Sequence, residues 1–185
     1  CGVTDIHFYY PYPDYKFMTC LYSDRALPGK GELSNNIRNF DRDRMLLFDE
    51  KNAYDGMLEE ELFPVFSNSY LVVLGERPRT DYIKYSNDRA GKFAIKTEIL
   101  TNDAGQKEVR KIPASIEAAD HVTGLSESYR KLEERFRGGK LSVNRCRLSA
   151  DLSVEERSAD RTFAVLDYVD GIPLSELMDR CLERK

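Results

Sequence analysis

The sequence of 185 residues lacks several features that would assign it to a common class of protein. No run of 18 apolar residues exists, so no segment is expected to span a membrane. The N-terminus has no basic stretch followed by an apolar core, so no signal peptide is visible. The net charge of −4 argues against a general nucleic-acid binder.

Cysteine and histidine are scarce and scattered. Four cysteines without CxxC spacing predict reduced thiols in a cytoplasmic protein, and they are Cys1, Cys20, Cys146 and Cys181. The two histidines, His7 and His121, lie far apart, so no metal site is expected. Because the chain starts at Cys1 rather than Met, we expect an incomplete N-terminus.

Charge divides the chain into two segments. Residues 1–78 carry 8 basic and 13 acidic side chains, a net charge of −5, whereas residues 79–185 carry 20 and 19, a net charge of +1. The shift falls at Arg77-Pro78-Arg79, which has the composition of a linker. We therefore predict one domain over 1–76, a linker over 77–80 and a second domain over 81–185.

The first segment reads as a strand, an excursion, a helix and a strand. Alternation predicts a strand over Thr4–Tyr10, ended by Pro11-Tyr12-Pro13. An irregular excursion over 16–50 follows, then a short helix over Ala53–Leu62 and an apolar strand over Tyr70–Leu74.

Here GVTDIHFYYPYPDY (2–15) followed by FSNSYLVV (66–73) resembles the tail of a bacterial class I S-adenosylmethionine-dependent methyltransferase. The resemblance implies an antiparallel strand pair that ends an α/β sheet, in an enzyme of cell-surface glycan biosynthesis with a sugar or glycan substrate. The chain has neither the family's glycine-rich cofactor loop nor its acidic ribose-binding residue. Bound S-adenosylmethionine would therefore need a preceding methyltransferase core, and this chain alone is expected to be inactive.

Three side chains of this segment are weak candidates for a substrate wall. Tyr10 and Tyr12 would either face a substrate or pack on the sheet with their hydroxyls at the rim. Asn68 would shape a turn or touch substrate. His7 is either a half-buried strand residue or a catalytic base, and no partner for it is identifiable.

The second segment predicts five antiparallel strands and a long helix. The strands are expected at Asp81–Tyr85, Phe93–Leu100, Glu108–Ile112, Leu141–Leu148 and Arg161–Val169, with turn chemistry at Asn102–Gly105 and a polar loop over 151–160. Apolar residues spaced three or four positions apart predict a helix over Ser115–Phe136, with Ser115 as its N-cap. A last helix is expected over Leu174–Glu183.

This order, with Val109-Arg110-Lys111 and RTFAVLDYVDGIPLSELM (161–178), resembles the small lobe of a protein-kinase-like domain. The resemblance implies that Lys111 contacts phosphates and is held by Glu127, with Glu117 as the fallback acid. It also implies that Leu166 forms the back wall of an adenine site, where the Asp167 carbonyl accepts a hydrogen bond and the Val169 N–H donates one. Lys111 and Glu127 as ordinary surface charges are the alternative.

The turn SNDRAGK (86–92) stands where a kinase has its glycine-rich loop, but it contains one glycine. Phosphate contact is expected from Arg89, Lys92 and the backbone near Gly91; a solvated hairpin turn is the alternative. No catalytic loop or magnesium motif follows, so ATP and magnesium binding would need a C-terminal kinase-like lobe.

The sequence thus predicts an α+β chain that joins a methyltransferase tail to a kinase-like small lobe. The alternatives are a non-catalytic, pseudokinase-like binding or scaffold module and a plain α+β interaction domain.

Overall fold

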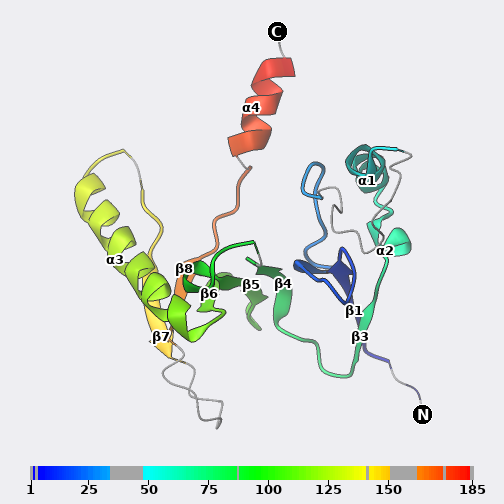
Figure 1. Ribbon diagram of the computed structural model, residues 1–185, viewed down its shortest axis with the longest axis horizontal. Coiled ribbons are helices and arrows are strands. Elements are labelled where there is room, and N and C mark those ends of the chain that lie inside the picture. Colours follow the sequence, from blue (N-terminus) through cyan, green and yellow to red (C-terminus); the bar gives the residue numbers. More distant parts are fainter. Residues whose placement is uncertain are drawn as a thin grey trace.

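A single antiparallel sheet of eight strands runs through the computed structural model of the protein, which describes residues 2, 4–33, 48–86, 88–140, 142–150, 162–172 and 174–183 (Figure 1). The spatial order is β3-β1-β2-β4-β5-β6-β8-β7. The predicted α+β class is therefore confirmed. Predicted features at Cys1, Asn87, Leu141 and 151–160, and residues 34–47 of the 16–50 excursion, lie outside the described residues.

The elements follow the predicted order. The strands are β1 (Ile6–Tyr12), β2 (Cys20–Ser23), β3 (Leu71–Leu74), β4 (Thr80–Tyr85), β5 (Ile95–Thr101), β6 (Lys107–Pro113), β7 (Cys146–Ala150) and β8 (Thr162–Asp167). The α-helices are α1 (Glu50–Glu59), α2 (Phe63–Phe66), α3 (Ala119–Phe136) and α4 (Leu174–Glu183), with short 3₁₀ turns η1 (Gly91–Phe93) and η2 (Ile116–Ala118).

Three local predictions are corrected. Pro11 does not end the first strand: β1 has no partner on its β3 side beyond Tyr9, and such an edge position tolerates proline. The excursion contains a strand, β2, which is too short to show alternation. Ser115 does not cap the helix, because its hydroxyl donates to the Gly91 carbonyl oxygen at 2.9 Å.

The β5–β6 hairpin forms as its turn residues predict. The Asn102 side-chain oxygen accepts from the N–H groups of Ala104 and Gln106 at 3.0 and 2.9 Å. Gly105 has φ of +77°, a left-handed conformation that costs glycine little. This turn sets the register that places Thr97 opposite Lys111.

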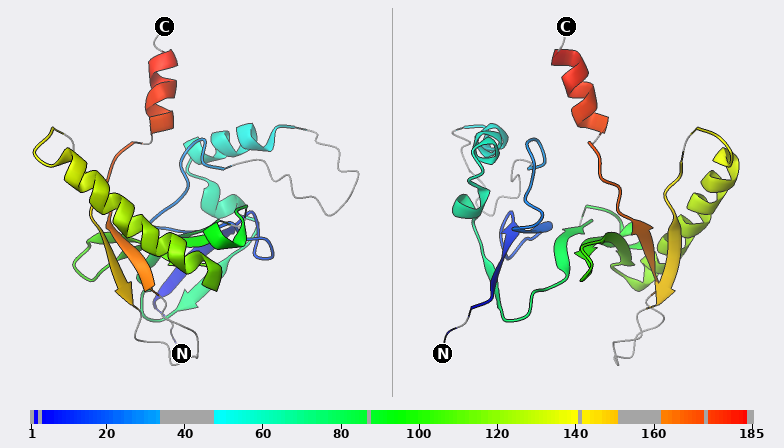
Figure 2. Two further views of the ribbon diagram at one scale, coloured as in Figure 1. Left: turned by 60° about the vertical axis from the view of Figure 1, so that its left-hand side comes forward. Right: turned by 180° about the vertical axis from the view of Figure 1, so that it is seen from behind.

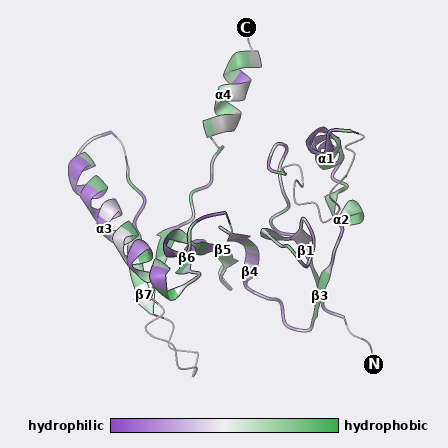
Figure 3. Cartoon of the chain, viewed as in Figure 1, coloured by the Kyte–Doolittle hydropathy of each residue, from purple (hydrophilic) through white to green (hydrophobic). Residues whose placement is uncertain are grey.

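Helices cover the two ends of one sheet face (Figures 1 and 2). Under α1 and α2 lies an aromatic core that includes Tyr10, Tyr12, Tyr22 and Phe63. Under α3 lies an aliphatic core that includes Ile95, Val122, Ala164 and Leu166. Figure 3 shows hydrophilic and hydrophobic residues alternating along α3, as in an amphipathic helix.

The predicted apolar stripe of α3 packs over only part of its length. Val122 is fully buried and Tyr129 packs on the same core, whereas Leu132 and Phe136 are 43% and 36% exposed. Ile116, in η2, is 82% exposed. The last turns of α3 therefore extend past the edge of the sheet.

The two predicted segments meet inside the sheet, where β2 pairs with β4 through Cys20–Lys84 and Leu21–Ile83. The carboxylate of Asp81, with no exposed surface, lies 2.5 Å from the Arg25 guanidinium and accepts a short hydrogen bond from the Thr101 hydroxyl. Arg25 also donates a hydrogen bond to the Pro78 carbonyl oxygen at 2.6 Å. The Tyr9 hydroxyl donates one to the Thr80 carbonyl oxygen at 2.6 Å. These bonds tie the predicted linker to the first segment.

None of the helices in the described ranges combines the length and apolarity that crossing a bilayer requires.

Arg25→Ala tests the ion pair across the two segments. The substitution leaves Asp81 buried without its cation, which we expect to lower the free energy of unfolding by about 3–5 kcal/mol. Arg79→Ala, which removes an exposed pair with Asp103, is the matched control and should cost less than about 1 kcal/mol. Urea unfolding followed by circular dichroism measures both. Equal losses would contradict a structural role for the Arg25–Asp81 pair.

Candidate functional site

Two lysines flank a threonine on the helix-covered face of the sheet. Register places Cys20, Lys84, Thr97, Lys111 and Ala164 in one row across five neighbouring strands. Residues opposite each other in antiparallel strands project to the same side. Cys20 lies in the core under α1 and α2, and Ala164 lies in the core under α3. Lys84, Thr97 and Lys111 therefore occupy the uncovered middle of this face.

The turn between β4 and β5 brings a third cation to the row. The turn is anchored at its base, where the Ser86 N–H donates to the Ile95 carbonyl oxygen at 3.0 Å. It is anchored on the α3 side by the Ser115–Gly91 hydrogen bond and by edge-to-face packing of Phe93 on His121, with ring centroids 5.3 Å apart. Arg89 is an exposed residue of this turn, and its positive charge lowers the pKa of Lys111.

Lys111 is half-buried, and its electrostatic surroundings are mostly positive. Burial lowers the pKa of Lys111 most, because it disfavours the charged form. Arg89 lowers the pKa further, Cys146 opposes this, and Lys84 adds a smaller decrease. Cys146, on β7, is itself partly buried, and burial raises the pKa of its thiol.

Lys84, Arg89 and Lys111 form what we call the basic cluster. Within the part of the chain that the structure describes, none of the three forms an ion pair or hydrogen bond through its side chain. Two other strand cations are paired, since Lys96 contacts Glu98 at 2.7 Å and Arg110 contacts Glu108 at 2.6 Å. Lys107 and Arg147 form no ion pair among the described residues, and the Lys107 ammonium lies 5.1 Å from the Tyr168 ring centroid. Two unpaired lysines on one face, with an unpaired arginine in the adjoining turn, favour an anionic ligand.

The predicted Lys111–Glu127 pair is wrong for this structure. Glu127 contacts Lys131 at 2.8 Å on the exposed side of α3, and this hydrogen bond and charge lower the pKa of its carboxyl. Val122 and Tyr129, seven residues apart, face the sheet, so Glu127, five residues after Val122, points about 140° away from it. The fallback acid, Glu117, does not reach Lys111 either.

Glu117 lies against the β4–β5 turn instead. A Cβ atom at Gly91 would be 3.3 Å from the Glu117 Oε2, so the carboxylate occupies the space beside this glycine. A phosphate at the Gly91 backbone would meet this like charge. Lys92 is exposed, and its ammonium lies 5.0 Å from the Phe93 ring centroid. Of the predicted phosphate-loop residues, Arg89 is therefore the one that the structure brings toward Lys111.

The predicted adenine-binding residues follow the row at the end of β8. Leu166 is buried beside Val109, on the same face as Lys111. The Asp167 carbonyl oxygen accepts from the Asn144 amide at 2.8 Å, which uses one of its two lone pairs. Val169 is 69% exposed. Adenine contact by Asp167 and Val169 stays a prediction.

The predicted substrate wall is buried. Tyr10 and Tyr12 are 3% and 8% exposed, so neither faces an open surface in this structure. Tyr10 packs edge-to-face on Phe63, and burial raises its pKa. Asn68 donates to the Pro13 carbonyl oxygen at 3.2 Å, which ties two loops together, and His7 contacts the Gly75 carbonyl oxygen at 3.2 Å.

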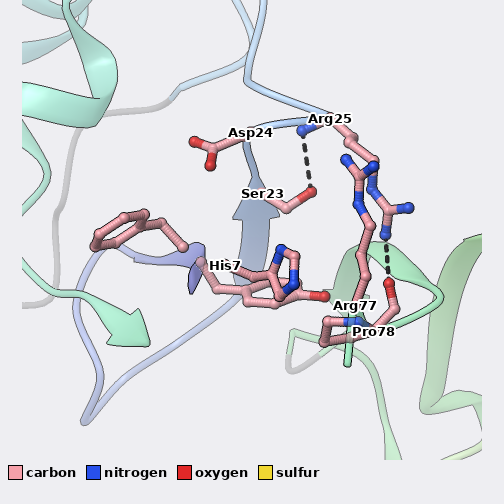
Figure 4. Close-up of a pocket in the computed structure, with 8 residues that line it drawn as sticks. His7, Ser23, Asp24, Arg25, Arg77 and Pro78 are labelled. Atoms are coloured by element: carbon pink, nitrogen blue, oxygen red, sulfur yellow. Dashed lines mark hydrogen bonds between the residues drawn. The ribbon is translucent and has the colours of Figure 1, made fainter. Parts of the chain in front are cut away.

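Two hollows lie away from the basic cluster. One of about 30 Å³, beside the Arg25–Pro78 hydrogen bond, holds at most about two water molecules; Figure 4 labels His7, Ser23, Asp24, Arg25, Arg77 and Pro78 around it. The other, of about 450 Å³, opens on the opposite sheet face, between Arg110, Arg147 and Asp167. Its guanidinium groups at Arg79 and Arg110 pair with carboxylates, whereas Arg147 and Lys107, which also line it, form no ion pair among the described residues. The larger hollow therefore also carries unpaired positive charge, on the sheet face opposite to the basic cluster.

Sequence reasoning missed Lys84, although a signal was present. Alternation in Asp81–Tyr85 already places Lys84 on one face of its strand. Only the register shows that this is the face of Lys111. No group of three metal-ligating side chains exists among the residues that the structure describes.

Arg89→Gln should raise the pKa of Lys111, and it should do so more than Lys84→Gln, because Arg89 is the stronger of the two positive influences. Arg130→Gln, on the exposed side of α3, is the control and should leave this pKa unchanged. NMR titration of the lysine ¹³Cε signals measures the effect. If neither Arg89→Gln nor Lys84→Gln changed the titration of Lys111, the basic cluster would not exist in solution.

No family model, no curated protein and no solved structure matches the chain. The interpretation of the site therefore depends on its geometry.

Proposed function

We propose that the second half of this chain binds the phosphates of a nucleotide, as the small lobe of a kinase-like domain joined to the tail of a class I S-adenosylmethionine-dependent methyltransferase. The observation that carries the proposal is the basic cluster. Its three cations have no acidic partner in the described residues; Lys84 and Lys111 lie on the uncovered part of one sheet face, and Arg89 lies in the adjoining β4–β5 turn.

The arrangement of elements supports the kinase-like half. Five strands follow one another in the order β4-β5-β6-β8-β7, and α3, which connects β6 to β7, packs on β6, β7 and β8. The chain leaves β8 through the exposed residues 168–172 and continues into α4. These features match the order of strands, helix and connection on which the sequence resemblance rests.

Each cation has a defined role in the proposed site. Lys111 supplies a partly desolvated charge, which attracts a phosphate more strongly than a fully hydrated one. Arg89 supplies a planar group with several donors, suited to two phosphate oxygens. Lys84 extends the positive row to β4. Leu166 and Val109 provide the apolar surface for a base.

The antiparallel β1–β3 pair, with Phe8 opposite Val72, supports the methyltransferase assignment of residues 1–76. No glycine-rich loop in this chain would hold S-adenosylmethionine. We infer that a methyltransferase core supplies that site in the parent protein, and that glycan synthesis is its setting, on the sequence resemblance alone.

A non-catalytic nucleotide-binding module is the second candidate. The observation that favours it is that no acid among the described residues pairs with Lys111, and the α3 side chains that pack on the core of the sheet are Val122 and Tyr129. A kinase requires a lysine–glutamate pair to align the phosphates. Without it, binding without phosphoryl transfer is expected.

Lys111→Ala and Lys84→Ala should each weaken ATP binding about 10- to 100-fold, from about 1.5–3 kcal/mol per charged contact. Isothermal titration calorimetry of the whole chain with ATP measures this, and circular dichroism verifies folding. Lys96→Ala, on the opposite sheet face, is the matched control and should bind like the parent chain. Equal affinity in all four proteins would refute the proposed site.

Glu127→Gln separates the two candidates. If ATP binding draws Glu127 to Lys111, as a catalytic arrangement requires, this variant should bind ATP more weakly. For the non-catalytic module, we expect unchanged affinity.

A further inference from the structure

The larger hollow, of about 450 Å³, lies on the sheet face opposite to the basic cluster. Its volume falls within the range of small-molecule sites, about 300–1,000 Å³. Register places Arg110 and Arg147 on either side of Val165, in one row of that face. Lys107, the first residue of β6, lines the same hollow. Cations from β6 and β7 therefore surround one open space, with β8 between them.

The acidic side chains that line this hollow are paired. Glu108 Oε1 accepts from Arg110 Nε at 2.7 Å and lies 2.6 Å from its Nη2. The Arg110 guanidinium also packs on the Phe163 ring, 5.2 Å from the ring centroid. Asp167 Oδ2 lies 3.4 Å from Arg145 Nε. The two carboxylates therefore each have a cation beside them before any ligand binds.

Lys107 and Arg147 are the cations of the hollow that remain without a partner. Both are exposed, and neither forms an ion pair among the described residues. The Lys107 ammonium lies 5.1 Å from the centroid of the Tyr168 ring, a second member of the lining. Arg79, the other cation of the lining, pairs with Asp103. The hollow thus offers two single positive charges, and a matching ligand carries two single negative charges.

We propose that this hollow binds a small molecule with two carboxylate groups, one at Arg147 and one at Lys107. A carboxylate matches the planar fork of Arg147, and the Lys107 ammonium acts as a point charge. A phosphate group, about twice as negative, would meet more repulsion from Glu108 and Asp167 in the same lining. The site is separate from the basic cluster and does not depend on the proposed nucleotide binding.

Titration of the ¹⁵N-labelled whole chain with sodium succinate, at constant ionic strength and followed by ¹H–¹⁵N correlation NMR, tests the site. We expect saturable shifts at Thr101, Lys107 and Arg147. Propionate, with one carboxylate, and pyrophosphate should each bind several-fold more weakly. No saturable shift, or shifts centred on Lys84 and Lys111 instead, would overturn the proposal. Equal binding of propionate would refute the two-carboxylate ligand, and tighter binding of pyrophosphate would refute the preference for carboxylate.

Arg147→Gln and Lys107→Gln should each weaken succinate binding about 5- to 10-fold, because each variant keeps one of the two charged contacts. Arg135→Gln is the control for a lost positive charge, since Arg135 is an exposed residue of α3 that forms no ion pair among the described residues. It should bind succinate like the parent chain. Spectra of the free variants verify folding. Equal losses in Arg147→Gln and Arg135→Gln would show a response to overall charge, and the proposed site would be wrong.

Discussion

The buried Asp81 carboxylate is the constraint on which the rest of the structure depends. A charge with no exposed surface needs compensation, and Arg25 supplies a cation beside Oδ1 while the Thr101 hydroxyl donates a hydrogen bond to Oδ2. Arg25 belongs to the first predicted segment, and Thr101 to the second. Satisfying this one carboxylate therefore holds β2 beside β4 and makes one sheet of two segments.

Joining the segments determines where the basic cluster lies. The aromatic core under α1 and α2 extends to Tyr82 on β4, and the aliphatic core under α3 begins at Ile95 on β5. Between these covers, Lys84 and Lys111 stay accessible although their strands are central in the sheet. A partly buried cation without a partner has lost some of its hydration, and a bound anion would offset this free-energy cost. This is the physical basis of the proposed phosphate site.

Sequence reasoning was strongest where a local signal decided the structure. Hydrophobic periodicity located seven of the eight strands to within a few residues, and turn chemistry located the β5–β6 hairpin. It failed at β2, whose four residues carry no usable alternation, and at Glu127, whose side of the helix depends on which α3 residues meet the sheet. At Tyr10 and Tyr12 it left a substrate wall and packing on the sheet as alternatives, because tyrosine suits both positions, and the structure buries both side chains.

The sequence by itself determined the α+β class, the order of the elements other than β2 and α2, and the candidacy of Lys111 and Arg89, since these depend on local pattern and residue type. Tertiary structure alone decided that Lys84 shares a row with Lys111, that Glu127 turns away and that Glu117 lies beside Gly91. The reason is that strand register and helix rotation are set by contacts between residues far apart in the chain, and no local pattern records them.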